Sequence, residues 1–158
     1  MVTRNSVLGV LRRHPSGVAV VTVETNGQRV GLTVATLTSL SLEPPLVGVA
    51  VARQAALHEL LREAGSFAVS LLAADQGHLA EHFARGVPPI GMWKGVAARE
   101  GELGAPLLDG ALGWLECRLV DELAAGTHTF FVGEVVGAIE GEQGVPLLRL
   151  GGELRPAH

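Results

Sequence analysis

The sequence predicts a mainly β protein, in which an antiparallel barrel carries short peripheral helices. Asn26-Gly27 divides two β-branched stretches within residues 17–36, and this dipeptide tolerates the positive φ angles of a two-residue hairpin turn. Residues 46–51 form an apolar run that fits a strand buried on both faces. Residues 111–122 and 128–140 are two further extended segments, so hairpin-connected strands dominate the predicted fold.

The remaining elements of the first half are short. Residues 6–13 predict a helix with Ser6 as its N-cap, which Pro15 ends. After the hairpin, Pro44-Pro45 marks the turn into the apolar strand. Residues 57–64 predict a second helix, because leucine and alanine recur there at helical spacing and the following glycine suits a left-handed cap.

The second half begins with a strand pattern over residues 66–72. Residues 75–85 then predict a short helix with Asp75 as its cap. From 86 to 110 the chain is rich in glycine and proline and lacks periodicity, which predicts a long loop. After the two extended segments, residues 146–150 predict a last strand.

Length and composition predict one domain over residues 1–158, because a chain of 158 residues is too short for two separate cores. Hydrophobic residues make up 47% of the chain and aromatic residues only 4%, so the core is expected to be aliphatic. A single chain of this size cannot readily bury so many apolar side chains in its own core. We therefore expect a homodimer with a large interface.

Charge and cysteine content exclude several classes of function. The net charge is −4 and the basic residues are spread along the chain, so the sequence shows no basic patch for binding nucleic acid or an anionic membrane. The apolar runs are far shorter than the roughly 20 residues of a membrane-spanning helix, and the N-terminus does not fit a signal peptide. Cys117 is the single cysteine, so no internal disulfide can form. We expect a cytoplasmic protein.

A cluster of hydroxyl side chains precedes the apolar strand. Thr36 and Thr38 share one face of a strand, whereas Ser39 and Ser41 fall on the other face. This slip by one residue predicts a bulge or kink at Thr38-Ser39. The cluster fits either an edge strand that shows its hydroxyls to water or a strand end that offers donors to a polar, planar ligand.

Three stretches together resemble the flavin reductase-like family of FMN-binding split barrels. They are HPSGVAVVTV at 14–23, GLTVATLTSLSLEPPLVGVAV at 31–51 and GTHTFFVGEVV at 126–136. The resemblance runs from Arg13 to about Leu150. It implies a dimeric split β-barrel with antiparallel, Greek-key-like connections. It also implies an NAD(P)H:flavin oxidoreductase that uses FMN or FAD and serves a partner monooxygenase.

The resemblance implies a flavin site along the hydroxyl-rich segment and the strand behind it. The residues implied to lie along the isoalloxazine ring, largely through backbone groups, are Thr33, Val34, Ala35 and Thr36. Those implied to serve its polar edge or ribityl chain are Thr38 and Ser39. Those implied to pack beside the flavin are Ala50 and Val51. The turn that contains Arg53 and Gln54 would face the phosphate.

The sequence departs from the family at this phosphate turn. The family usually places Ser and Thr there, whereas this chain has Ala55, Ala56 and Leu57. A hydrogen bond to a charged group contributes roughly 1.5 to 3 kcal/mol, so losing two lowers phosphate affinity about a hundredfold or more. Arg53, Gln54 and the start of the following helix offset part of this loss. Three outcomes stay open: weak FMN binding, a preference for FAD, or a lost flavin site.

His128 is the candidate catalytic residue. The resemblance places it by the nicotinamide and flavin rings, and a hairpin-end histidine in solvent is the alternative. Three further candidates are expected to line the entrance of the same site and to bind the dinucleotide: His14, Ser16 and Gly17. Because the cofactor carries the chemistry, the protein needs to hold two stacked rings rather than supply an acid or base.

Three further residue patterns favour ordinary structural roles. His78, Glu81 and His82 match the zinc motif H-x-x-E-H, but no third ligand is evident, so we expect a solvated helix face and no metal. Cys117 is expected to be a small packed residue. Trp93 is expected to anchor the long loop, and covering the entrance of the flavin site is its alternative role. The alternative function is a non-catalytic split barrel that binds flavin or another planar cofactor, and a ligand-free structural dimer comes third.

Overall fold

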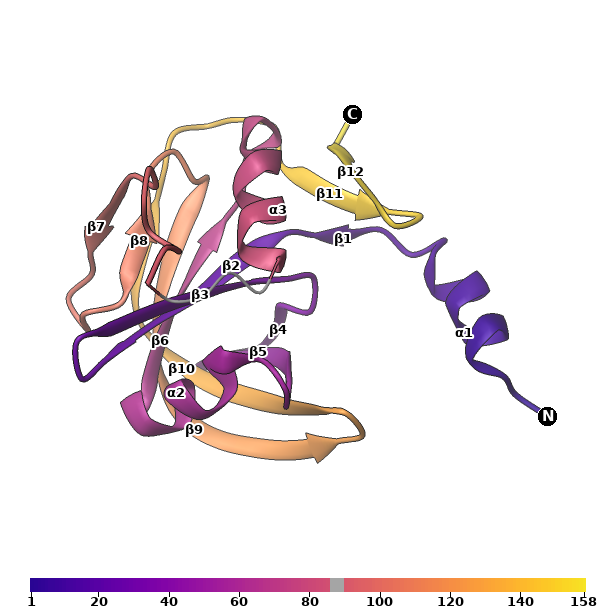
Figure 1. The fold of residues 1–158 in the computed structure, drawn as a ribbon, viewed down its shortest axis with the longest axis horizontal. Coiled ribbons are helices and arrows are strands. Elements are labelled where there is room, and N and C mark those ends of the chain that lie inside the picture. Colours follow the sequence, from indigo (N-terminus) through magenta and orange to yellow (C-terminus); the bar gives the residue numbers. More distant parts are fainter. Residues whose placement is uncertain (86–89) are drawn as a thin grey trace.

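The computed structural model of the chain describes residues 1–85 and 90–158. Seven strands form one antiparallel sheet in the order β3-β2-β6-β9-β10-β5-β4 (Figure 1). These strands are β2 (Ala19–Thr25), β3 (Gln28–Val34), β4 (Thr38–Leu42), β5 (Pro45–Ala52), β6 (Ser66–Leu71), β9 (Gly113–Ala125) and β10 (His128–Glu140). The sheet curves until β3, at one edge, approaches β5 near the other. The predicted mainly β, antiparallel architecture with short helices is confirmed.

Local backbone chemistry explains the first hairpin. Asn26 and Gly27 have φ angles of 51° and 79°, and they join β2 to β3 with Thr25 opposite Gln28. Positive φ at both central residues matches the right-handed twist of the flanking strands. The hairpin predicted from this dipeptide is confirmed.

Two small sheets flank the large one. The first contains β1 (Ser16–Gly17), β11 (Leu147–Leu150) and β12 (Glu153–Pro156), and the second pairs β7 (Ala98–Glu100) with β8 (Pro106–Leu108). The prediction of an unbroken loop from 86 to 110 is therefore wrong over its second half, and residues 86–89 lie outside the described residues. β12 also extends the chain beyond the strand predicted to be last. Strands of three or four residues are too short to show a periodic pattern.

Two helices, α1 and α3, each begin two residues away from the cap that the sequence predicted. In α1 (Arg4–Leu11) the N-cap is Thr3, whose hydroxyl accepts a hydrogen bond from the Ser6 N–H at 3.1 Å. Ser6 Oγ in turn accepts one from the Thr3 N–H at 3.1 Å, so Ser6 completes a capping box instead of forming the cap. Asp75 lies inside the short 3₁₀ turn η1 (Ala74–Gln76) and does not cap α3 (Gly77–Ala84).

The core lies inside the curved sheet and beneath two of the helices. α2 (Ala56–Ala64) buries Leu57 and Leu61 against it, and Gly65 ends α2 with a φ of 67°, as predicted. The core includes aliphatic side chains from β2, β5 and β6, together with the large rings Phe67, Phe83 and Phe131. In the described ranges, no helix is long and apolar enough to cross a membrane.

The hydroxyl-rich strand β4 is irregular near the predicted position. Its register against β5 passes from Ser39 opposite Val47 to Ser41 opposite Leu46. Leu40 is therefore the extra residue of a bulge, one position beyond the Thr38-Ser39 pair that the sequence indicated. The bulge places Ser41, opposite Leu46, on the same face as Thr38, opposite Gly48, and leaves Ser39 on the other face. It therefore accounts for the position of Ser41 in the hydroxyl pattern.

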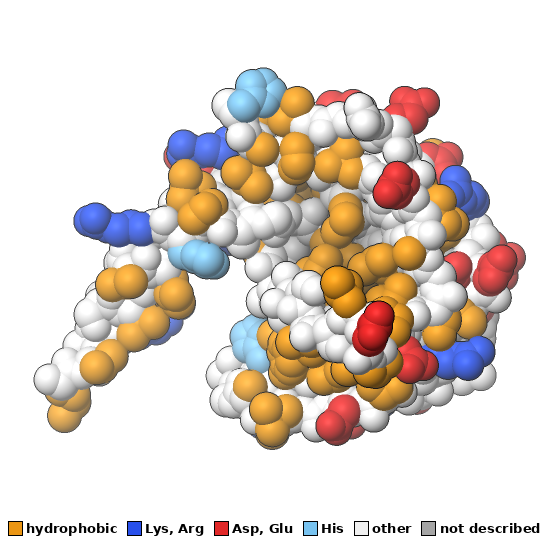
Figure 2. Space-filling model, turned by 180° about the vertical axis from the view of Figure 1, so that it is seen from behind, with side chains coloured by type: hydrophobic (Ala, Val, Ile, Leu, Met, Phe, Trp, Pro, Cys, Tyr) orange, Lys and Arg blue, Asp and Glu red, His pale blue; other side chains and the backbone are white. Residues whose placement is uncertain are grey.

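The N-terminal helix α1 stands away from the rest of the molecule (Figure 1). None of its eight residues, all of which the structure describes, is buried. Val7, Val10 and Leu11 are exposed, and hydrophobic side chains line the arm in Figure 2. An isolated helix of this length is marginal in water, and α1 has no buried residue to stabilise it.

Candidate functional site

A cavity of about 580 Å³ opens between the base of the α1 arm and the sheet. Figure 2 shows the surface hollowed there. Its wall is formed by β1 and the chain on either side of it, the segment between β3 and β4, the end of β6, the residue ahead of β9 and the start of β11. The lining residues are His14, Pro15, Ser16, Gly17, Val18, Ala19, Ala35, Thr36, Leu37, Thr38, Leu71, Leu72, Leu112, Pro146 and Leu147. The fold therefore brings two predicted groups together: the dinucleotide candidates at 14–17 and the flavin candidates at 35–38.

Thr36 joins this cavity to strand β5. Its Oγ1 accepts a hydrogen bond from the Ala50 N–H and donates one to the Ala50 carbonyl oxygen, each at 3.0 Å. The Thr36 hydroxyl thus acts as a strand partner for β5 at the point where β4 no longer pairs with it. The predicted flavin residues Thr36 and Ala50 are consequently one structural unit.

Strands β5 and β10 form an open sheet face next to this link. Ala50 lies opposite Phe130 and Ala52 opposite His128, so these four side chains share one face and are half-buried. The alternate residues of both strands, which include Val51 and Phe131, point into the core. We call the first set the open face: Ala50, Ala52, His128 and Phe130.

Several predicted flavin residues have their side chains turned inward. Val51 is fully buried and Val34 is nearly so. The Thr33 hydroxyl donates to the Ala80 carbonyl oxygen of α3 at 2.6 Å. These three can meet a ligand on the sheet through backbone groups only. Ser39 is exposed on the bulged strand β4, outside the cavity lining.

The predicted phosphate turn lies beside the predicted catalytic histidine. The Arg53 N–H donates to the Thr127 carbonyl oxygen at 3.0 Å, and the Thr127 hydroxyl lies 2.9 Å from Nδ1 of His128. Arg53 and Gln54 are exposed. The N-cap of α2 is Ala55, which has no polar side-chain atom, so the first turn of α2 offers only backbone N–H groups.

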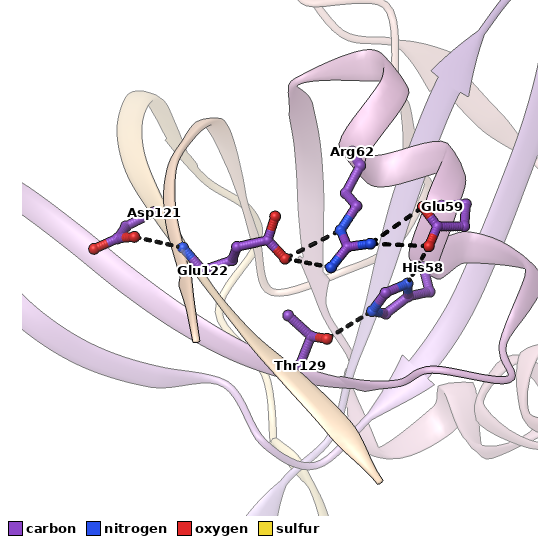
Figure 3. A network of polar contacts seen from close by, with 6 residues as sticks. All are labelled: His58, Glu59, Arg62, Asp121, Glu122 and Thr129. Atoms are coloured by element: carbon purple, nitrogen blue, oxygen red, sulfur yellow. Dashed lines mark hydrogen bonds and ion pairs between the residues drawn. The ribbon is translucent and has the colours of Figure 1, made fainter. Parts of the chain in front are cut away.

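A network of polar side chains ties α2 to the β9–β10 hairpin (Figure 3). Nε2 of buried His58 lies 2.7 Å from Oγ1 of buried Thr129, and Nδ1 lies 3.3 Å from Oε1 of Glu59. Arg62 pairs with Glu59 at 3.0 Å and with Glu122 at 2.7 Å. The hydrogen bond with Glu122 is the largest cause that raises the pKa of the Arg62 guanidinium above its usual value.

Comparison with known proteins identifies the family. Residues 11–158 match the family described as "Flavin reductase like domain". The chain belongs to the flavin reductase-like family. The family predicted from the three sequence stretches is thus confirmed.

Several similar proteins and solved structures are named as flavin reductases. The chain is 40% identical to an NADH-dependent FAD reductase of Streptomyces globisporus, over 89% of this chain and 79% of the relative. It is 42% identical to the reductase component of 4-hydroxyphenylacetate 3-monooxygenase of Thermus thermophilus, over 87% and 86%. The NADH:FAD oxidoreductase of Streptomyces globisporus C-1027, solved with NAD and FAD fragments, superposes with a TM-score of 0.90 at 38% identity, covering 96% of this chain and 91% of that one. The names of these proteins include the reductase activity, NADH and FAD that the sequence predicted.

Sequence reasoning missed part of this flavin reductase-like site. Phe130 was not singled out, although it follows His128 by two residues and so shares its face in a strand. The cavity also contains residues from the end of β6, from Leu112 and from β11, which long-range pairing brings in. Leu147 N–H donates to the Leu72 carbonyl oxygen at 3.1 Å, a contact across 75 residues that leaves no local sequence pattern.

The other singled-out residues have structural contacts. Nε2 of His82 lies 2.6 Å from the Met92 carbonyl oxygen, so the expected solvated face is wrong for half-buried His82, whereas His78 and Glu81 are exposed. The described part of the chain contains no group of three His, Cys, Asp or Glu side chains that could hold a metal. Trp93 Nε1 donates to the Arg29 carbonyl oxygen at 2.8 Å, so its predicted anchoring role is confirmed. Cys117 is fully buried, as predicted, and burial raises the pKa of its thiol to about 12.

Proposed function

We propose that this protein is an NAD(P)H:flavin oxidoreductase that transfers hydride from NAD(P)H to FMN or FAD. The observation that supports this best is the Thr36–Ala50 link, which joins a residue of the cavity lining to a residue of the open face. The predicted dinucleotide residues line the cavity, whereas His128 and the Arg53-Gln54 turn lie outside its lining, next to Ala52 of the open face. The activities named for the relatives support the same reaction.

The residues of this surface fit a flavin. A volume of about 580 Å³ is within the range of small-molecule sites, about 300 to 1,000 Å³. Ala50, Ala52 and Phe130 offer an apolar sheet face to a planar ring, and the backbone groups of residues 35–38 offer hydrogen bonds to its polar edge. The exposed Arg53 guanidinium and the uncapped start of α2 suit an anion.

The proposed mechanism needs binding and orientation more than acid–base chemistry. A bound flavin supplies the hydride acceptor, and NAD(P)H supplies the hydride. The role of this chain is to hold the two rings face to face and to exclude water from between them. Phe130 and Ala50 form the apolar support, and His128, half-buried at the edge of the open face, orients the nicotinamide by a hydrogen bond from its ring.

The phosphate turn favours flavin that exchanges readily. Because Ala55 and Ala56 supply no hydroxyl, the phosphate meets only backbone N–H groups and the side chains of Arg53 and Gln54. We propose that flavin binds as a diffusible substrate and leaves, once reduced, for a partner monooxygenase. The relatives that are reductase components of two-component monooxygenases support this partner class.

We further propose a homodimer. Leu40 and Leu42 on β4 and Leu123 on β9 are 46%, 83% and 65% exposed, and α1 presents an apolar side to solvent. A second copy covering these side chains would offset the cost of leaving them in water. Light scattering after size exclusion is expected to give about twice the mass of one chain, and Leu42→Glu is expected to shift it toward one.

Location and domain organisation follow from the same proposal. A reaction that consumes NAD(P)H fits the cytoplasm, and a chain whose one cysteine cannot form an internal disulfide is compatible with that reducing compartment. We propose that residues 1–158 act as one domain, because residues from both halves of the sequence share the main core.

A fluorescence titration with riboflavin, FMN and FAD tests the proposal, followed by NADH or NADPH in the same cuvette. Saturable flavin binding with consumption of the nicotinamide is expected. The ratio of FMN to riboflavin affinity isolates the contribution of the phosphate, and we expect it to be below tenfold. Flavin binding without turnover would replace the reductase with a non-catalytic binding protein. No binding of any flavin at tens of micromolar would overturn both the reductase function and the non-catalytic flavin-binding function.

A further inference from the structure

His58 is a buried polar side chain that the proposed reaction does not use. It is 3% exposed, and its partner Thr129 is 2% exposed. The 2.7 Å contact between His58 Nε2 and Thr129 Oγ1 is closed to water, so water cannot replace either partner if the other is lost. The His58 ring also packs against Phe131, with 5.3 Å between ring centres and 58° between planes.

The pleat of β10 connects this buried contact to the open face. Thr129 and Phe131 point inward to His58, whereas His128 and Phe130, their immediate neighbours, point outward. A shift of Thr129 therefore moves the backbone that carries His128. Only one peptide unit separates the buried hydroxyl from the predicted catalytic residue.

Helix α2 and the start of β10 are joined at two points. The first is the hydrogen bond from the Arg53 N–H to the Thr127 carbonyl oxygen, just ahead of the helix. The second is the His58–Thr129 contact in its first turn. Two separate contacts restrict the movement of α2 against β10 more than one contact would, and they hold the phosphate turn close to His128.

A third connection lies outside, at the surface. Arg62 bridges Glu59 and Glu122 between α2 and β9, on the exposed side of the network in Figure 3. Arg62 and Glu122 are 41% and 39% exposed. Ion pairs with this exposure contribute little to stability, because water screens the two charges. The buried contact is therefore the one expected to control geometry.

We propose that His58 is a positioning residue: through Thr129 it fixes His128 and the Arg53-Gln54 turn relative to each other, so that one rigid unit meets the nicotinamide and the flavin phosphate. The inference rests on the proposed reductase function and deepens it. The buried His58–Thr129 contact holds the backbone in place, and the residues of the open face contact the ligands.

A matched pair of variants tests the proposal. Thr129→Ser keeps the hydroxyl that meets His58, whereas Thr129→Val keeps the shape and removes it. Thr129→Val is expected to raise KM for NADH about fivefold to tenfold, with kcat changed less than twofold, and Thr129→Ser to stay within twofold of the wild type. Equal effects of the two variants, or none from either, would overturn the proposal. If Thr129→Val does not fold, His58→Gln against His58→Leu gives the same comparison.

A double variant with His128 distinguishes a positioning role of Thr129 from a role in stability alone. In a His128→Ala background, Thr129→Val is expected to have no further effect on KM for NADH, because the residue it positions is gone. Independent, multiplying effects on KM would show that Thr129 acts elsewhere and would overturn the proposal. Arg62→Ala is the control: it breaks the exposed pairs and is expected to leave KM within twofold.

A readout without turnover keeps this test distinct from that of the reductase function. The ring resonances of His128, identified by their loss in His128→Ala, are expected to move in the NMR spectrum of Thr129→Val and to stay in place in Thr129→Ser. Unmoved resonances in Thr129→Val would overturn the positioning role. If the wild type consumes no NADH while these resonances respond as expected, the reductase function fails and the His58–Thr129–His128 relation stands.

Discussion

The hydroxyl of Thr36 satisfies both backbone polar groups of Ala50, with a hydrogen bond of 3.0 Å to each. Thr36 lines the cavity, and Ala50 belongs to the open face of the sheet. One side chain thus joins the two halves of the candidate site across 14 residues of sequence. The hydroxyl cluster singled out in the sequence has a structural role in addition to any role toward a ligand.

Thr36→Val is expected to weaken both stability and flavin binding. It removes the two hydrogen bonds to Ala50 of strand β5, which lowers the free energy of unfolding by about 1 to 2 kcal/mol. The Ala50 N–H and carbonyl are then free to shift, and flavin affinity is expected to fall about fivefold. Urea denaturation and fluorescence titration measure the two effects. Thr36→Ser keeps the hydroxyl and serves as the control, so an equal loss in this variant would contradict the explanation.

His128→Ala is expected to raise KM for NAD(P)H about fivefold to tenfold, the size of one hydrogen bond to the nicotinamide. Flavin affinity is expected to change less than twofold, since Ala50 and Phe130 still support the ring. Steady-state kinetics with varied NADH and a separate flavin titration distinguish the two constants. His78→Ala, on the exposed side of α3, is the matched control. An unchanged KM would remove His128 from the dinucleotide site.

Gly48→Ala is expected to disturb the open face through Phe130. A Cβ at position 48 would come within 2.8 Å of several atoms of the Phe130 ring, which packs on the glycine. Overpacking of this kind costs about 1 to 3 kcal/mol, and the displaced ring would lower flavin affinity. In a Phe130→Ala background the same substitution is expected to be nearly neutral in thermal unfolding. An equal cost in both backgrounds would show that the clash lies elsewhere.

Sequence reasoning succeeded where the physical cause is local. Asn26-Gly27 and Gly65 act through their own φ angles, so the hairpin and the end of α2 could be predicted from the sequence. The slip in the hydroxyl pattern predicted the β4 bulge within one residue, because side-chain alternation has a period of two. Ser6 was misread as a cap because the two members of a capping box look alike in sequence.

The rest of the site depends on pairs that are distant in the chain. His58 and Thr129 are 71 residues apart, and neither stands in a pattern that indicates the other. The β7–β8 pair has strands of three residues, each too short to show alternation. Apolar residues such as Leu71 and Leu147 read as ordinary core, and only the fold places them beside the candidate dinucleotide residues.

Ala55→Ser is expected to strengthen both α2 and phosphate binding. A serine N-cap is worth about 0.5 to 2 kcal/mol over alanine, so the melting temperature is expected to rise. The added hydroxyl also restores a donor at the predicted phosphate position, and FMN affinity is expected to rise about threefold to tenfold. Riboflavin, which has no phosphate, is the internal control. A matching gain for riboflavin would place the effect outside the phosphate turn.

The buried Cys117 thiol is expected to make stability fall at alkaline pH. Burial, with a smaller contribution from Glu116, raises the pKa of Cys117 from 9.0 to about 12 in the folded protein. Between these values the unfolded chain loses the thiol proton and the folded chain keeps it. Rising pH therefore stabilises the unfolded state, and the free energy of unfolding falls by up to about 1.4 kcal/mol per pH unit.

This alkaline loss is unusually open to measurement, because the chain has no tyrosine and a single lysine, Lys94, to titrate in the same range. Urea denaturation at pH 8 and at pH 10.5 is expected to show a marked drop in the free energy of unfolding for the wild type. Cys117→Ala is expected to start lower at pH 8, owing to the small cavity it leaves, and to lose much less between the two pH values. A drop of equal size in both proteins would assign the alkaline loss to other groups and show that the Cys117 thiol ionises as readily in the folded state as in the unfolded one.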